Sequence, residues 1–135
     1  MKKLKKIILI VILTGINLYS QSQFQQFINR VNSVSDVNQK NIIVDSFMVV
    51  ARASGIPFIE GNVANFIYRG SANTVSIAGD MTGWDANIAK CTKLQGTNFF
   101  YFSQGYELNA RLDYKIVLNG SNWILDPENP KTCPG

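Results

Sequence analysis

The sequence predicts a mostly β protein, a sandwich of short strands preceded by a short two-helix segment. Two observations support this prediction. Apolar residues recur at helical spacing in residues 23–56, and from residue 57 onward short β-type runs are separated by Gly, Asn and Asp. A length of 135 residues suits one compact domain with terminal extensions. We therefore divide the chain into residues 1–22, 23–56 and 57–135.

Residues 1–22 have the features of a secretory signal peptide. The basic head MKKLKK precedes an apolar run at residues 7–16, and small serine residues follow as candidate cleavage positions. This run is short for a membrane-spanning helix, which needs roughly 20 apolar residues, so an uncleaved anchor is the lesser alternative. We expect a secreted or periplasmic protein with no membrane contact after cleavage.

The charge of the mature chain argues against nucleic-acid binding. Four of the 13 Lys and Arg residues lie in MKKLKK, and the other nine are balanced by nine Asp and Glu residues. A nucleic-acid-binding protein needs a basic surface to replace the counterions around phosphates. We therefore expect no nucleic-acid partner.

Residues 23–56 are expected to form two amphipathic helices. Apolar side chains at helical spacing mark one face of the first helix: Phe24, Phe27, Ile28, Val31 and Val34. Asp36 followed by Gln39 resembles a capping box, and Gly55 before Pro57 is a stop signal, so a second helix lies between them. We expect these helices to cover the neighbouring β domain; the alternative is that they dock onto another domain or partner.

Residues 57–135 contain five candidate strands: VANFIYR, NTVSIAG, TNFFYFS, RLDYKIVLN and WILD. In the fourth, one face is expected in the core and the other at the surface. The first face is formed by Leu112, Tyr114, Ile116 and Leu118, and the second by Asp113, Lys115, Val117 and Asn119. Asn119 and Gly120 tolerate positive φ and predict a tight hairpin turn into WILDP.

The chain lacks the residues and motifs that enzymes commonly use for catalysis. It contains no histidine, which excludes Ser-His-Asp and Cys-His arrangements, and it has no GxSxG, phosphate-loop or dinucleotide motif. The nine acidic residues are scattered, which disfavours a carboxylate pair for glycoside hydrolysis. We expect no catalysis by these residues and no cofactor.

Two cysteines, Cys91 and Cys133, remain in a chain that is expected to leave the cytoplasm. A disulfide between them would tie the C-terminal tail to the middle of the domain, and the alternative is two unrelated buried thiols. Two cysteines without histidine do not make a zinc site, so we expect no metal.

The segment GDMTGWD places the indole of Trp84 in a turn, where large apolar rings are uncommon. Trp84, Trp123 and Lys115 are the residue types of a sugar-binding surface, because aromatic rings stack on C–H faces and ammonium groups bind hydroxyls. One aromatic contact adds about 0.5–1.5 kcal/mol beyond burial, whereas a millimolar complex needs about 4 kcal/mol, so such binding would be weak. The alternative is a packing role for both indoles and a solvated Lys115.

The segments FIYRGSANTVSIAGDMTGW and ARLDYKIVLNGSNWILDPENP, in this order, resemble the immunoglobulin-like, early-set domain of the glycogen-binding and family 48 carbohydrate-binding module group. The form most similar to this chain stands at the N-terminus of secreted feruloyl or acetyl esterases, where WILDPENP leads into an α/β-hydrolase domain. The resemblance covers residues 57–135 and implies an early-set β-sandwich that lacks its last strand.

This resemblance implies roles for particular residues. In the glucan-binding members, a tryptophan that ends a turn, a strand lysine and a tryptophan after the next hairpin form the sugar platform, and Trp84, Lys115 and Trp123 match them. Tyr68 matches a structural strand aromatic. The hairpin NGSNW is one residue longer than usual, and a three-residue loop would place Trp123 and Lys115 on one face, whereas a two- or four-residue loop would place them on opposite faces.

Two functions follow from the resemblance. The leading one is a non-catalytic N-terminal accessory domain of an exported esterase that acts on carbohydrate-linked esters, with a C-terminally fused α/β-hydrolase as partner. The other is an independent module that binds α-glucans such as glycogen or starch. The accessory role leads because the third sugar-contacting segment of the glucan binders would lie beyond Gly135. The signal peptide disfavours a third possibility, an intracellular scaffold subunit.

Overall fold

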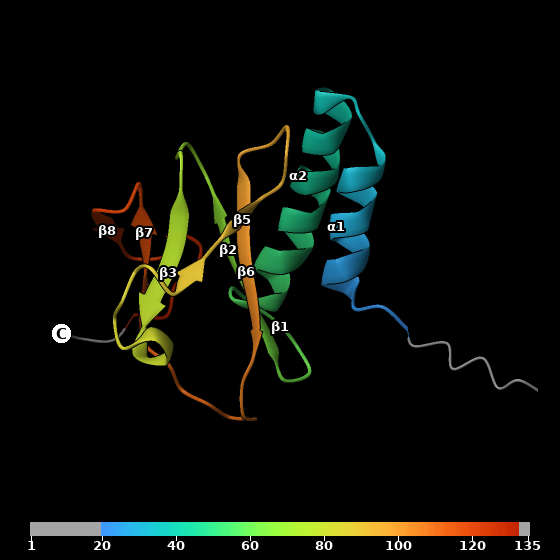
Figure 1. Cartoon of the computed structure of the whole chain (residues 1–135). Helices are drawn as coiled ribbons and strands as arrows, with labels where there is room; N and C mark the ends of the chain where they lie inside the picture. The colour runs from blue at the N-terminus through green and yellow to red at the C-terminus, as the bar shows by residue number, and fades with distance from the viewer. Residues whose placement is uncertain (1–19, 133–135) are drawn as a thin grey trace, which may run out of the picture.

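The computed structural model describes residues 20–132, which form two α-helices and eight short strands in two antiparallel sheets (Figure 1). The protein is thus mostly β with its helices at the start, as predicted. Most of the expected signal peptide, residues 1–19, lies outside the described residues, as does Cys133. Between residues 20 and 132, neither helix has the length and apolarity that crossing a membrane requires.

The two helices are α1 (Gln23–Ser33) and α2 (Val37–Ser54). The predicted start of α2 is confirmed, because an Asp36 carboxylate oxygen accepts a hydrogen bond of 2.8 Å from the Gln39 backbone N–H. The predicted stop is confirmed as well, since Gly55 caps the helix with a φ of 104°. Val34 was expected on the apolar stripe of α1, but its backbone is extended and it lies one residue beyond the helix.

The strands are β1 (Phe58–Glu60), β2 (Val63–Arg69), β3 (Val75–Gly79), β4 (Ala89–Lys90), β5 (Thr92–Lys93), β6 (Phe99–Gly105), β7 (Tyr114–Leu118) and β8 (Asn122–Ile124). One sheet has the order β1-β2-β6-β5 and the other the order β4-β3-β7-β8. The five predicted strands correspond to β2, β3, β6, β7 and β8. The short strands β1, β4 and β5 were not predicted.

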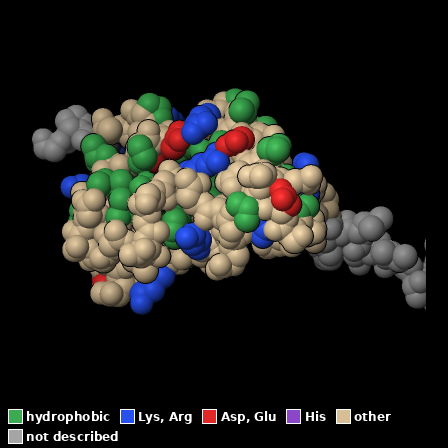
Figure 2. Space-filling model, turned by 90° about the horizontal axis from the view of Figure 1, so that it is seen from above, with side chains coloured by type: hydrophobic (Ala, Val, Ile, Leu, Met, Phe, Trp, Pro, Cys, Tyr) green, Lys and Arg blue, Asp and Glu red, His purple; other side chains and the backbone are tan. Residues whose placement is uncertain are grey.

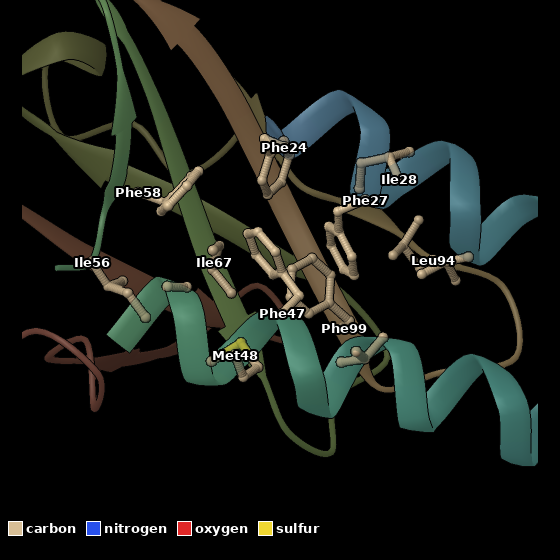
Figure 3. Close-up of a cluster of buried hydrophobic side chains, with 13 residues drawn as sticks. Phe24, Phe27, Ile28, Phe47, Met48, Ile56, Phe58, Ile67, Leu94 and Phe99 are labelled. Atoms are coloured by element: carbon tan, nitrogen blue, oxygen red, sulfur yellow. The ribbon is translucent and has the colours of Figure 1, made fainter. Parts of the chain in front are cut away.

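The helices cover one face of the β1-β2-β6-β5 sheet, which confirms the first of the two interpretations above. Their apolar stripes meet side chains of that sheet in a buried cluster (Figure 3). At its centre the rings of Phe27 and Phe47 stack with centroids 4.0 Å apart, and Phe99 of β6 meets both edge-on.

A second buried cluster lies between the two sheets. It joins Phe66 and Tyr68 of β2 to Ile77 of β3 and Ile116 of β7, so the sheets pack face to face. Tyr68 is buried there, as expected for a structural residue. From right to left, Figure 1 shows the resulting layers: the helices, the sheet that contains β1, β2, β5 and β6, and the sheet that contains β3, β7 and β8.

The fourth predicted strand departs from its pattern at two residues. Leu112 was expected in the core, but it lies two residues before β7 and is only partly buried. The second residue is Val117. Tyr114, Ile116 and Leu118 pack in the inter-sheet cluster, as expected. Val117 points to the other face and yet has an exposed fraction of 0%. Since Trp123 of β8 is its direct cross-strand partner, the indole lies on the same face and contributes to this cover.

Candidate saccharide-binding surface

Trp84 follows a single turn of 3-10 helix, η1 (Asp80–Thr82), that continues from β3. Two consecutive residues then adopt left-handed backbone conformations, Gly83 with φ 58° and Trp84 with φ 65°. The Trp84 N–H donates to the Gly79 carbonyl over 2.9 Å, which closes the turn. A left-handed residue with a bulky side chain costs about 1–3 kcal/mol and is most common at functional sites.

The turn is fastened to the strand that carries Lys115. Asp80 N–H donates to the Asp113 carbonyl (3.0 Å), and Asp113 N–H donates to an Asp80 carboxylate oxygen (2.8 Å). Gly79 permits this approach, because a Cβ at this position would collide with the Asp113 carbonyl oxygen. The position of Trp84 is therefore set by two hydrogen bonds between Asp80 and Asp113, the residue directly before β7.

The hairpin between β7 and β8 has a three-residue loop, Asn119-Gly120-Ser121, with Leu118 and Asn122 paired across it. Asn119 and Gly120 have φ values of 52° and 77°, in agreement with the predicted turn. Trp123 pairs with Val117, which lies two residues from Lys115. Because side chains alternate with a period of two, Trp123 and Lys115 share the outward face of the sheet.

The outward face of β7 and β8 carries an exposed group of side chains. Both indoles are partly open to solvent, with 44% of Trp84 and 42% of Trp123 exposed. Leu125 continues the alternation of Trp123 and is 59% exposed. Among residues 20–132, neither indole makes a ring contact with another aromatic side chain.

Trp84, Lys115 and Leu125 line one hollow of about 260 Å³. Polar groups border the same hollow, among them Asp113, Asn129 and Lys131. Trp123 is not among the lining residues and lies farther along the same face, beside Val117. A spacing of two residues along a strand is about 7 Å, which is the distance along β7 between Lys115 in the hollow and Val117 beside Trp123.

A hydrogen-bonded network fixes the wall of this hollow. The Tyr114 hydroxyl donates to an Asp126 carboxylate oxygen over 2.7 Å, and the Asn129 side-chain amide donates to the Tyr114 oxygen over 3.2 Å. Burial raises the pKa of Asp126 and of Tyr114 above their ordinary values. The segment that follows β8 is thereby held against β7.

A salt bridge also links the segment that follows β8 to helix α2. Arg52 of α2 binds the Glu128 carboxylate through two nitrogens, at 2.6 and 2.8 Å. The hydrogen bond from Arg52 lowers the pKa of Glu128. On the face shown in Figure 2, basic and acidic side chains are interspersed and form no patch of one sign.

The structure thus brings the three predicted residues to one surface. It adds Leu125, Asp126 and Asn129, which sequence reasoning missed. Leu125 could have been found, since it follows Trp123 by two residues in an alternating run. Asp126 and Asn129 act through contacts with Tyr114, and no local pattern signals these contacts.

Cys91 lies between β4 and β5 and is half-buried. Burial raises the pKa of its thiol to about 12, so the thiol is protonated at neutral pH and a poor nucleophile. Its expected partner, Cys133, lies outside the described residues, and the disulfide stays a prediction. Residues 20–132 contain no cluster of three or more Cys, Asp or Glu side chains suited to a metal ion.

No protein-family model matches this chain. No curated protein matches it with significant similarity either.

Proposed function

We propose that this chain is a non-catalytic carbohydrate-binding domain of the immunoglobulin-like, early-set kind, and that it binds α-glucan chains through Trp84, Lys115 and Trp123. The observation that best supports this proposal is the three-residue hairpin loop, which puts Trp123 on the face of Lys115. The two face-to-face antiparallel sheets are compatible with the proposed fold.

The chemistry of the surface suits a sugar chain. Two half-exposed indoles offer flat faces for C–H groups. Among the described residues, the Lys115 side chain forms no hydrogen bond or ion pair, so its ammonium group can donate to sugar hydroxyls. Two stacking contacts and a few hydrogen bonds yield a dissociation constant on the order of a millimolar. Such binding is useful when many sites on one polymer are close together.

Affinity electrophoresis tests this proposal. We expect glycogen or amylopectin in the gel to retard the protein, and Trp84→Ala or Trp123→Ala to remove most of the retardation. Ile88→Ala is the matched control, because Ile88 is 64% exposed in the connection between η1 and β4 but does not line the hollow. Equal mobility with and without either polysaccharide would contradict the proposal.

A second candidate function is an accessory domain of an exported esterase, fused to an α/β-hydrolase that acts on carbohydrate-linked esters. The exposed Leu125 favours it, because an aliphatic side chain in the same hollow as Trp84 suits a domain interface better than a sugar. The genomic reading frame tests this candidate. It should continue after Gly135 into a domain with a GxSxG motif, and a stop codon at that point would count against it.

Both candidate functions include export of the protein from the cytoplasm. We propose that the mature chain begins near residue 23 and is secreted or periplasmic. N-terminal sequencing of the protein recovered from the medium or the periplasm tests this, and recovery from the cytoplasm with Met1 intact would contradict it.

A further inference from the structure

Helix α2 carries apolar side chains on two faces. Four of them are buried in the cluster that the helices share with the neighbouring sheet: Val44, Phe47, Met48 and Ala51 (Figure 3). Away from this face, Ile42 is 63% exposed, Val49 68% and Val50 39%. A surface helix is normally polar on the side that faces water. The outward face of α2 therefore has the composition of a contact surface, although nothing in residues 20–132 covers it.

The outward face has the residue spacing of a helix that packs against another helix. Five exposed residues of α2 are separated alternately by three and four positions: Gln39, Ile42, Ser46, Val49 and Ala53. This spacing keeps side chains in one line where two helices pack side by side, and we call the line the α2 seam. Ser46 is small and lies between the larger Ile42 and Val49, so a second helix can approach closely at the middle of the seam.

The charged residues of α2 all contact other parts of the same chain. Lys40 Nζ donates to a backbone carbonyl in the loop between β5 and β6, over 2.9 Å. Asp45 forms a salt bridge with Arg69 of β2, and Arg52 forms one with Glu128. The α2 seam itself carries no charge, as is typical of the centre of a protein interface. Two identical seams can therefore meet without electrostatic repulsion.

Water can be removed from the α2 seam at little cost. The Ser46 hydroxyl donates to the Ile42 carbonyl over 2.9 Å within the helix, so it keeps a hydrogen bond when the seam is covered. Gln39 lies at the end of the seam, where its amide can stay in contact with water at the rim of an interface. The other seam residues are aliphatic.

The size of the α2 seam limits the strength of such a contact. The helix has 18 residues, which makes it about 27 Å long, and a helix is about 10 Å wide. A contact along one whole face covers on the order of 300 Å² on each protomer. Stable interfaces begin at roughly 600 Å² a side, so this contact belongs to the weak, reversible class.

We propose that the outward face of α2 is an interface between two copies of this chain, which pair weakly through their α2 seams. A second copy fits because it presents the same uncharged line of large and small side chains. The two surfaces are identical, so the contact has twofold symmetry and stops at a dimer. This inference does not depend on the glucan proposal, because Trp84, Lys115 and Trp123 lie outside α2.

Sedimentation equilibrium of the exported protein tests the dimer. Between about 10 µM and 1 mM, we expect the average mass to rise from that of a monomer towards that of a dimer, with a dissociation constant on the order of 0.1–1 mM. A monomer at every concentration would overturn the proposal and would point to another occupant of this face, such as a fused domain. Growth beyond a dimer would overturn it as well, because a twofold contact is closed.

Two lysines on the α2 seam test which face forms the dimer. The double variant Ile42→Lys, Val49→Lys should weaken dimerisation about tenfold or more, because like charges then meet across the interface. Both side chains are more than 60% exposed, so the midpoint of thermal unfolding should change little. The matched control is Ile88→Lys, Leu108→Lys, which adds the same charge at exposed residues outside α2 and should dimerise normally. An equal effect of the two double variants would overturn the assignment to α2.

A mixture of oppositely charged variants separates loss of contact from misfolding. Ile42→Glu, Val49→Glu should be as monomeric as the double-lysine variant. An equimolar mixture of the two should form heterodimers, because glutamate then meets lysine in both a parallel and an antiparallel pair of helices. Added salt should weaken these heterodimers. A mixture that stays monomeric up to about 1 mM would overturn the proposal.

Discussion

The phenylalanines and the tryptophans of this protein occupy opposite environments. Seven of the eight phenylalanines are buried, and the eighth, Phe102, packs against the inter-sheet cluster. Both tryptophans keep more than 40% of their surface exposed. A phenylalanine has no hydrogen-bonding group, whereas the indole N–H needs a partner when it is buried. The comparison separates the aromatic residues that stabilise the fold from those that are available for binding.

The largest effect that the comparison predicts is on stability. Phe47→Ala should lower the free energy of unfolding by about 3–5 kcal/mol, because it removes a ring that stacks on Phe27 and meets Phe58 and Phe99. Trp123→Ala should lower the free energy of unfolding far less. Denaturant unfolding of both variants measures the difference, and similar losses would break the comparison.

The next prediction separates the contribution of the Trp84 indole from that of the Trp84 backbone conformation. Trp84→Gly should be about 1–2 kcal/mol more stable than Trp84→Ala, because glycine adopts a φ of 65° without steric cost. Both variants should lose glucan retardation equally. The same denaturant measurement tests this, and an equal stability of the two variants would mean that the turn is not left-handed in solution.

A smaller effect is expected in the hairpin that positions Trp123. Gly120→Ala should destabilise the protein by about 1 kcal/mol, because a residue with a Cβ rarely adopts a φ of 77°. No atom lies within 4 Å of the added Cβ, so the whole loss comes from the backbone conformation. Ser121→Ala in the same loop is the control. If Gly120→Ala leaves both stability and glucan binding unchanged, the hairpin does not depend on this conformation.

The smallest expected effect is the pH dependence of stability that Asp126 causes. Asp126 lies in the wall of the hollow beside Trp84. Because burial raises the pKa of Asp126 in the folded protein, the folded state binds its proton more tightly than the unfolded state does. Its contribution to stability is therefore present below the ordinary carboxyl pKa of 3.8 and is lost as the pH rises through the raised value.

Asp126→Asn should remove this loss of stability and keep a side-chain oxygen that accepts a hydrogen bond from the Tyr114 hydroxyl. Unfolding in urea at several values between about pH 3 and 7 measures it. A profile with the same slope in the variant and the natural protein would show that Asp126 is not buried as described.

Much of the fold was predictable where the determinants are local. The ends of α2 follow from capping by Asp36 and Gly55, which act within one turn. The strands β1, β4 and β5 have only two or three residues each, too few for an alternating pattern, and their partners are set by tertiary contacts. Val117 was predicted at the surface because the pattern carries no information about a cross-strand neighbour such as Trp123.

The candidate site was predictable in its residues but not in its geometry. The motif order pointed to Trp84, Lys115 and Trp123, yet whether two of them share a face depended on the loop length. The sequence NGSNW is compatible with loops of different length, and only the pairing of Leu118 with Asn122 decides it. A second hollow, of about 550 Å³, was not predicted at all, because its lining comes from residues 57–66, 106–114 and 129–132, which are far apart in the chain.

The chain crosses between the two sheets with a single residue, Cys91, between β4 in one and β5 in the other. On this side the sheets are joined covalently and cannot separate. The opposite side ends in the edge strands β1 and β8, which have no such short link, so we expect thermal opening of the inter-sheet core to begin there. Amide hydrogens of β1 and β8 should therefore exchange with solvent before those of β3 and β6.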